Sequence, residues 1–189
     1  MEKVITAGER GKIFESLYSR HRLEVLAYCA RRIGPSDAAD ACSETFLVAW
    51  RRIEDVPAPP MTLPYLYGIA GRVLSNHFRA LHRRSRLGTV LGSLGVTSPP
   101  EPADVVLQNS KNQDVVAAVR RLSPKDREIV MLYTWEELSR ETIAEMMGTT
   151  KAAIDQRIHR SYRRLARMMA PTMESNPIQP PPIAKEGGT

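Results

Sequence analysis

Cysteine is scarce in this sequence of 189 residues, which has only Cys29 and Cys42. There is no Cys-X-X-Cys pair and no cluster of cysteine with histidine, so the chain has no zinc-binding motif of a known type. Both cysteines lie among the apolar positions of expected helices. We therefore expect two free thiols in a hydrophobic core and no metal ion.

The residue patterns that catalysis requires are also missing. The sequence has no nucleophile beside a base and no glycine-rich loop of the kind that cradles phosphate groups. The histidines are scattered along the chain, at His21, His77, His82 and His159. These absences favour a protein that is not an enzyme, with no catalytic residues and no cofactor.

Long apolar runs are absent as well. No stretch of about 18 apolar residues occurs, so no transmembrane helix is expected. The first residues, MEKVITAGERGK, lack the apolar segment of a signal peptide. We therefore expect a cytoplasmic protein without membrane insertion. Its net charge of +6 mildly favours an anionic partner such as nucleic acid.

What the sequence does contain is helical periodicity, in two blocks that flank a stretch rich in glycine, serine and proline. The pattern predicts an all-α protein with two small helical domains, residues 10–87 and 112–169. Residues 88–111 are expected to form a flexible linker between them. Residues 170–189 are rich in proline and are expected to be a disordered tail.

The first block begins with amphipathic helices. The apolar pattern from Phe14 to Cys29 fits one or two helices, and Gly34-Pro35 should end them. Ser36 is the expected N-cap of the next helix. The buried face of that helix should comprise Cys42, Phe46, Ala49, Trp50 and Ile53. Its other face carries Asp40, Glu44 and Arg51.

A long helix should follow from Thr62 to about Arg84, after a loop that its prolines make stiff. Its buried stripe is expected to comprise Leu66, Ile69, Ala70, Val73, Leu74 and Leu81. Its polar face carries Tyr65, Arg72, Asn76, Arg79 and Arg83. Residues 72–86 include no acidic residue. A basic stripe headed by an aromatic ring is typical of surfaces that bind unpaired nucleic-acid strands.

The second block predicts a helix-turn-helix. Ser123 should cap a helix that begins with Pro124, and Asp126 occupies the acidic position of a capping box. Two further helices, Ser139–Met147 and Lys151–Met168, flank a turn that contains glycine. Packing across this turn would let the last helix enter a major groove. The packing residues should be Ile143, Met146 and Met147 on one side, and Ile154, Ile158 and Leu165 on the other.

One face of the last helix is expected to meet duplex DNA. It comprises Lys151, Ala152, Asp155, Gln156, His159, Arg160 and Arg163. Gln156 suits adenine, and Arg160 suits guanine or phosphate. Asp155 would repel phosphate, so it either accepts a hydrogen bond from cytosine or pairs with Arg160 or another arginine. Attraction to phosphates regardless of sequence should come from Arg157, Arg163, Arg164 and Arg167.

Three segments carry patterns typical of one family. They are DAADACSETFLVAWRRI (37–53), PYLYGIAGRVLSNHFRALHRR (64–84) and LSPKDREIVMLYTWEELSRETIAEMMGTTKAAIDQRIHRSYRRL (122–165). In that order they resemble region 2.2, regions 2.3 and 2.4, and region 4 of bacterial RNA polymerase sigma factors of the sigma-70 family. The order and spacing resemble those of the compact extracytoplasmic-function (ECF, group IV) subfamily.

The resemblance implies a transcription initiation factor that binds core RNA polymerase and promoter DNA. Docking on the β′ coiled coil would involve Asp40, Glu44, Leu47 and Arg51, with Phe46 and Trp50 assigned to the core. Melting and capture of the −10 element would involve Tyr65, Arg72, Asn76, Arg79 and Arg83, beside the loop Glu54–Thr62. The second domain would read the −35 element with the last helix and contact the β-flap. An anti-sigma factor is a further implied partner.

Two other functions compete with this one. A stand-alone helix-turn-helix regulator would use the first block to sense a ligand or to dimerise. Such a regulator leaves the acidic face at Asp40 and Glu44 and the basic stripe without a role. An adaptor that binds polymerase without contacting the promoter is the third possibility.

Overall fold

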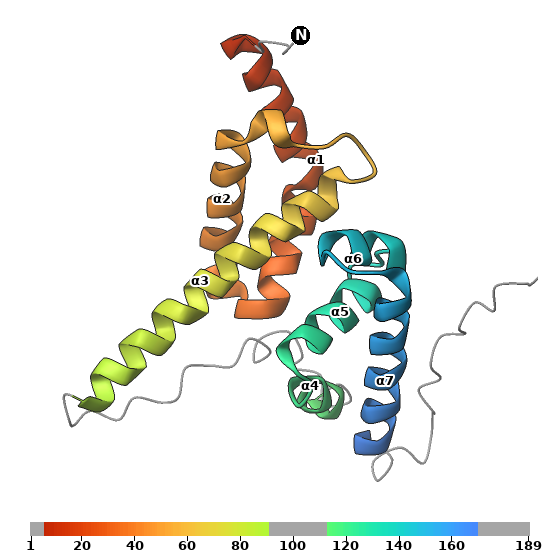
Figure 1. Cartoon of the computed structure of the whole chain (residues 1–189). Helices are drawn as coiled ribbons and strands as arrows, with labels where there is room; N and C mark the ends of the chain where they lie inside the picture. Colours follow the sequence, from red (N-terminus) through yellow and green to blue (C-terminus); the bar gives the residue numbers. More distant parts are fainter. Residues whose placement is uncertain (1–5, 91–112, 170–189) are drawn as a thin grey trace, which may run out of the picture. The chain divides into compact units, whose positions relative to one another are not determined.

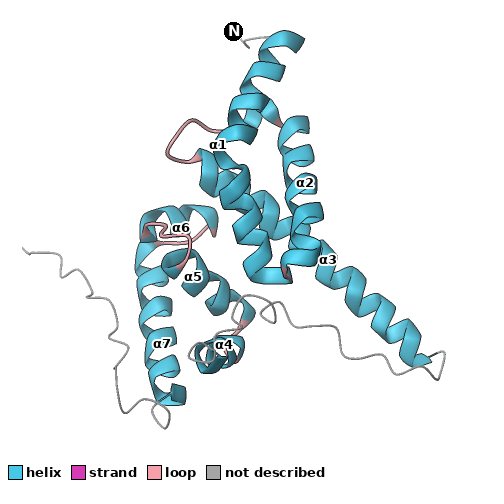
Figure 2. Ribbon diagram, turned by 180° about the vertical axis from the view of Figure 1, so that it is seen from behind, coloured by secondary structure: helices cyan, strands magenta, loops and turns pink. Residues whose placement is uncertain are grey.

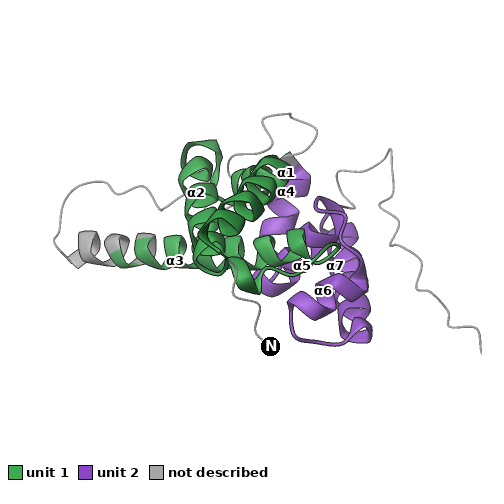
Figure 3. Ribbon diagram, turned by 90° about the horizontal axis from the view of Figure 1, so that it is seen from above, with its two compact units in different colours: residues 1–106 green, residues 107–189 purple. Residues whose placement is uncertain are grey.

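The computed structural model describes residues 6–90 and 113–169 of the chain (Figure 1). These residues form α-helices and one short 3-10 helix and include no strand (Figure 2), which confirms the all-α prediction. The chain divides into two compact units, residues 1–106 and 107–189 (Figure 3). The expected linker and tail fall almost entirely outside the described residues.

The first unit opens with one long helix, α1 (Ala7–Ile33), rather than two. Thr6 and Glu9 form a capping box at its start. Gly34, with φ of 92°, ends α1 and is also the N-cap of α2 (Pro35–Arg51). The predicted cap at Ser36 is therefore wrong by two residues. The left-handed glycine turns the chain so sharply that Pro35 already occupies the first helical position.

The core of the first unit lies between α1, α2 and α3 (Thr62–Val90), which all contact one another. As predicted, α2 buries Cys42, Phe46 and Ala49, whereas Trp50 is only half-buried. Ile53 is buried too, but it belongs to a 3-10 helix, η1 (Ile53–Asp55), that follows α2.

The start of α3 is fixed by Thr62, whose buried hydroxyl donates a hydrogen bond to the carbonyl of Pro57 at 2.8 Å. The predicted stripe from Leu66 to Leu74 is buried in full, while the side chain of Leu81 lies outside the described residues. The helix runs past Arg84 to Val90, so residues 88–90 are helical and not part of a linker. Its last turns project beyond α1 and α2 (Figure 1).

The two cysteines are buried thiols of this core, as predicted. The Cys42 thiol donates to the carbonyl of Arg22 in α1, with 3.8 Å between sulfur and oxygen. Burial raises the pKa of the Cys42 thiol, which keeps it protonated and unreactive. Its role is therefore packing.

The second unit comprises α4 (Gln113–Arg120), α5 (Pro124–Thr134), α6 (Arg140–Met146) and α7 (Lys151–Met169). The first three all pack on α7. Ser123 caps α5 as predicted, because its hydroxyl accepts from the backbone N–H of Asp126 and donates to that residue's carboxylate. Leu165 was assigned to the wrong seam: it packs with Val119 and Leu122, in the cluster between α4 and α7.

Candidate nucleic-acid interface

The turn between α6 and α7 has the geometry of a helix-turn-helix. Gly148 adopts φ of 59°, a left-handed conformation that glycine tolerates best. Thr150 then caps α7, since its hydroxyl accepts from the N–H of Ala153 at 3.2 Å. At the other end of the motif, the hydroxyl of Ser139 accepts from the N–H of Thr142 and caps α6. These caps define both helices within a residue or two of the predicted bounds.

The seam between α6 and α7 is apolar and determines which face of α7 is exposed. Ile143, Ile154 and Ile158 are almost completely buried. Ala152, Gln156, Arg160 and Arg163 are exposed, and Lys151, Asp155 and His159 are partly exposed. A shallow hollow on this face is lined by Ala152, Asp155, Gln156, His159 and Arg160. The structure therefore gathers five of the seven residues expected to face duplex DNA around one depression.

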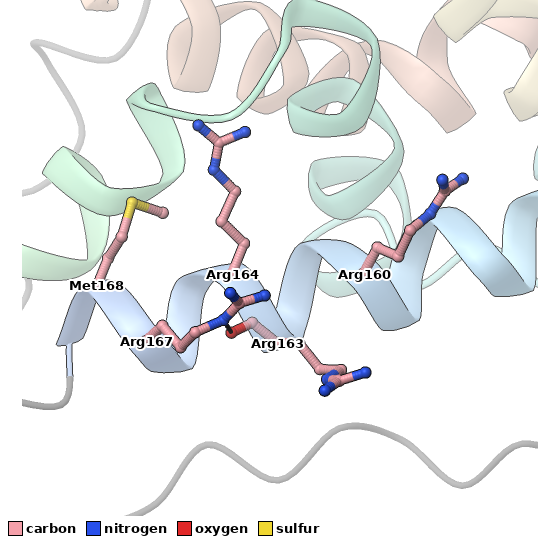
Figure 4. Close-up of a pocket in the computed structure, with 5 residues that line it drawn as sticks. All are labelled: Arg160, Arg163, Arg164, Arg167 and Met168. Carbon is pink, nitrogen blue, oxygen red and sulfur yellow. Dashed lines mark hydrogen bonds between the residues drawn. The ribbon is translucent and has the colours of Figure 1, made fainter.

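A second hollow lies along the C-terminal half of α7 (Figure 4). Its five lining residues are Arg160, Arg163, Arg164, Arg167 and Met168. Four guanidinium groups with no acid among the lining residues form a surface suited to phosphate, which arginine can bind through paired hydrogen bonds. The positive charge of α7 thus continues beyond the residues assigned to base recognition.

Arg157 does not belong to this arginine-rich face. Its guanidinium pairs with Asp126 at the start of α5, with 2.6 Å between Nη1 and Oδ1. Burial tends to raise the pKa of Asp126, but hydrogen bonds from Ser123 and Arg157 outweigh it and hold that pKa below its usual value. The prediction that Arg157 attracts phosphate missed this ion pair, because helix periodicity reveals a face but no partner on another helix.

Asp155 pairs with Arg140, the first residue of α6, with 3.2 Å between Nη1 and Oδ1. This outcome confirms the alternative in which another arginine neutralises Asp155. Arg140 also bonds the Tyr133 hydroxyl at 3.3 Å and lies 5.4 Å from the centre of that ring. The hydrogen bond to Tyr133, followed by the negative charge of Asp155, raises the pKa of Arg140. Sequence reasoning missed Arg140 because only the turn brings positions 140 and 155 together.

A second ion pair joins the same two helices. Lys151 in α7 lies 3.1 Å from Glu141 in α6. A hydrogen bond from its own backbone N–H, and then the one from Lys151, lower the pKa of Glu141. This pair is far more exposed than the pair between Arg140 and Asp155, so solvent screens it more strongly.

The basic stripe of α3 is exposed as predicted for the polar face of that helix. Arg72, Asn76, Arg79 and Arg83 are all exposed, and Tyr65 is half-buried at the head of the stripe. Arg79 donates to the Asn76 side-chain oxygen at 2.6 Å, which aligns the two side chains on the helix surface. The stripe therefore presents donors along one face of α3 without an acid of its own helix between them.

The outer face of α2 carries the residues that the resemblance assigned to a protein partner. Asp40, Glu44, Leu47 and Arg51 are all exposed, and Leu47 keeps 48% of its surface accessible. Phe46 lies in the core with 2% exposed, as the sequence analysis assigned it. An exposed leucine between charged residues forms a small amphipathic surface.

An arginine that sequence reasoning overlooked links α1 to η1, the 3-10 helix that follows α2. Arg10 lies 2.6 Å from Glu54 in η1 and 5.6 Å from the centre of the Trp50 ring. It also donates to the carbonyl of Trp50 at 3.4 Å. Arg10 and Glu54 are 44 positions apart in the sequence, which explains why no local pattern revealed the contact.

Within residues 6–90 and 113–169, no helix combines the length and apolar character that crossing a bilayer requires. The same part of the chain brings together no group of three potential metal ligands.

Comparisons with known proteins identify the class. The family described as Sigma-70 region 2 matches residues 17–84, and Sigma-70, region 4 matches residues 112–165. The first match covers most of the bundle of α1, α2 and α3, and the second covers the helix-turn-helix and α4 before it. The chain therefore belongs to the sigma-70 family of RNA polymerase sigma factors.

The curated relatives point to the ECF subfamily. ECF RNA polymerase sigma factor BldN of Streptomyces coelicolor is 34% identical over 86% of this chain and 62% of its own length. Probable RNA polymerase sigma factor RfaY of Xanthomonas campestris is 28% identical over 65% of this chain and 31% of its own length. The chain thus spans less than two thirds of both relatives.

A solved structure shares the fold. The sigma factor RpoE in complex with the anti-sigma factor NepR, from Bartonella quintana, matches with a TM-score of 0.63 and 19% identity. The match covers 86% of this chain and 99% of that one.

Proposed function

We propose that this chain is a transcription initiation factor that binds core RNA polymerase and directs it to promoters. The observation that carries the proposal is the presence of two different nucleic-acid surfaces in the two units. One is the exposed basic face of α3, and the other is the helix-turn-helix of α6 and α7. The region 2 and region 4 matches fall on these same two surfaces. The proposed domains are residues 10–87 and 112–169.

In this proposal the second unit reads the −35 element as duplex DNA. Gln156 and Arg160 are exposed at the hollow of α7, and their side chains have the donors and acceptors that bind base edges in a major groove. Lys151, Ala152, His159 and Arg163 complete this face, and Asp155 lies among them. The arginines of the second hollow supply attraction to phosphates, which strengthens binding to any sequence.

The first unit melts the −10 element and holds the unpaired strand. Arg72, Asn76, Arg79 and Arg83 supply donors to the strand backbone, and the half-buried ring of Tyr65 supplies a surface on which a base can stack. A flipped base costs a few kcal/mol of lost stacking, so its capture needs such contacts. The loop between η1 and α3 lies beside Tyr65 in the sequence and is the proposed pocket.

The outer face of α2 is the proposed contact with the polymerase. Asp40 and Glu44 lie one helical turn apart and can pair with a basic partner, while Leu47 adds apolar contact. Arg51 extends the face. The partner is the β′ coiled coil, and the second unit would contact the β-flap.

An anti-sigma factor is the proposed regulator, and the protein would act in the cytoplasm with the polymerase. The structural neighbour from Bartonella quintana is bound to such a factor. The outer face of α2 and the DNA-facing side of α7 both carry exposed residues to which such a partner can bind.

The experiment that tests the proposal adds the purified chain to sigma-free core polymerase with a library of genomic DNA. We expect run-off transcripts that begin at a defined set of promoters and that require the chain. A core that stays inactive, while the chain alone protects duplex operators, would instead support a stand-alone helix-turn-helix regulator. A core that is captured without promoter-specific transcripts would support an adaptor.

A further inference from the structure

Three elements of the second unit meet at the guanidinium of Arg140. The side chain begins at the first residue of α6, bonds Tyr133 near the end of α5 and pairs with Asp155 in the second turn of α7. Only 15% of the Arg140 side chain and 21% of the Asp155 side chain are exposed. Because water screens this pair poorly, it constrains the two helices more than an exposed pair would.

Asp155 occupies a position where an unpaired acid would be harmful. It lines the hollow of α7 together with Gln156 and Arg160. A carboxylate at that surface repels the phosphates of a duplex, and its pairing with Arg140 neutralises the charge without removing the acid. The Nε of Arg160 instead donates a hydrogen bond to the carbonyl of Gln156, one turn earlier in α7, at 3.3 Å.

We propose that Arg140 is a positioning residue for DNA reading and that Asp155 acts through Arg140 rather than on a base. The pair holds the start of α7 against α6 and α5, which sets the direction in which Gln156 and Arg160 project. This inference rests on the proposed reading of duplex DNA by the second unit. It assigns to Arg140 a role in promoter discrimination, although Arg140 itself contacts no base.

The neighbouring pair supports this arrangement. Arg140 and Glu141 are adjacent in α6, and their partners Asp155 and Lys151 lie one turn apart in α7. In one pair α6 supplies the positive charge, and in the other it supplies the negative charge. The two pairs together therefore fix the register of α6 against α7. The shielded pair carries most of the constraint, because the Lys151 and Glu141 side chains are 40% and 63% exposed.

The test selects binding sites with the full chain bound to core polymerase, from a promoter library randomised in the upstream duplex element. Arg140→Ala, Asp155→Ala and the double variant are compared with the original chain. We expect each single variant to flatten the base preference and to weaken the best site about tenfold. The double variant should be no weaker than either single variant, since both remove the same constraint. Arg140→Lys should restore part of the preference.

The matched controls are Arg121→Ala and Glu145→Ala, which remove one exposed charge of each sign from the same unit. Both should keep the original base preference. Affinity for random duplex DNA gives a second readout. It should stay unchanged or rise a fewfold in Asp155→Ala, because a negative charge is lost from the DNA-facing surface.

Three results would overturn the inference. Direct reading by Asp155 would change the preferred base at one position in Asp155→Ala and leave Arg140→Ala unaffected. Additive losses in the double variant would show that the two residues act independently. A purely structural role would lower random and selected binding equally, together with the thermal stability of the second unit. Failure of the original chain to enrich any sequence would instead overturn the proposed function.

Discussion

Arg157 of α7 and Asp126 of α5 are joined by an ion pair of 2.6 Å, and the same carboxylate bonds the hydroxyl of Ser123 that caps α5. One acid therefore stabilises the start of α5 and fastens α7 to it. Asp155 and Arg140 fasten the same helix to α6 from a position two residues away. The rotation of α7 about its own axis is thus set by polar contacts on either side of its buried isoleucines.

Replacement of Asp126 should lower the stability of the second unit at neutral pH and remove part of its dependence on pH. Its folded-state pKa is lowered, so the ionised carboxylate stabilises the fold above the unfolded pKa of about 3.9, and this contribution disappears as pH falls through the folded value. Asp126→Asn should therefore cost about 1 kcal/mol near pH 7 and almost nothing well below the folded pKa. Urea unfolding followed by circular dichroism measures both. Asp114→Asn, at an exposed site in α4, is the control, and an equal loss at both pH values would contradict the prediction.

Two glycines of α3 should respond oppositely to alanine. A Cβ at Gly71 would lie 3.2 Å from the hydroxyl of Tyr28, whereas a Cβ at Gly68 would meet nothing within 4 Å. Tyr28 cannot retreat easily, since it is buried and stacked on Tyr67 at 4.7 Å between ring centres. Gly68→Ala should stabilise the first unit by about 0.5–1 kcal/mol through helix propensity, and Gly71→Ala should destabilise it.

The Tyr28→Phe background separates the steric contact from other causes. Without the Tyr28 hydroxyl, Gly71→Ala should become stabilising, as Gly68→Ala is. Thermal unfolding of the original chain, Tyr28→Phe, Gly71→Ala and the double variant measures this change. A loss at Gly71 that persists without the hydroxyl would show that something other than this contact opposes the methyl group.

Arg10→Ala should loosen the junction between α1 and η1. The variant loses the contact with Glu54 and the stacking on Trp50, which together are worth about 1 kcal/mol at partly exposed positions. Because η1 precedes the proposed pocket, capture of the unpaired strand should weaken as well. Arg10→Lys keeps the charge but not the planar group, so it should recover only part of the stability. Chemical denaturation measures the loss of stability, and binding of a fluorescent single-stranded oligonucleotide measures strand capture. Unchanged strand binding would show that Arg10 does not influence the proposed pocket.

Arg79→Ala should weaken open-complex formation more than the initial binding of the −35 element. Arg79 lies on the stripe of α3 and bonds Asn76, and both residues belong to the unit proposed to hold the unpaired strand. Permanganate footprinting reports strand opening, and filter binding of an upstream duplex reports the first contact. Arg20→Ala, at an exposed position of α1, is the matched control. Equal losses in both assays would argue against the division of labour between the units.

Much of the architecture follows from local sequence patterns. Ser123 and Ser139 mark helix starts because N-capping involves residues only three positions apart. Thr62 begins α3, and its hydroxyl donates to the carbonyl of Pro57 five residues earlier. The error at Ser36 arose where two signals competed, and the left-handed Gly34 placed Pro35 at the first helical position. The buried stripes of α2 and α3 were recognisable because an apolar face repeats with the helical period.

The sequence alone determined that this is a helical protein with a basic stripe in one block and a helix-turn-helix in the other, since periodicity, capping and charge act over a few residues. Only the tertiary structure decided which charges on those helices have partners. In the structure Arg157 forms an ion pair with Asp126, Asp155 with Arg140, and Arg10 with Glu54. Each of these pairs joins residues far apart in the sequence. Such residues come into contact only when the apolar faces of the helices pack together.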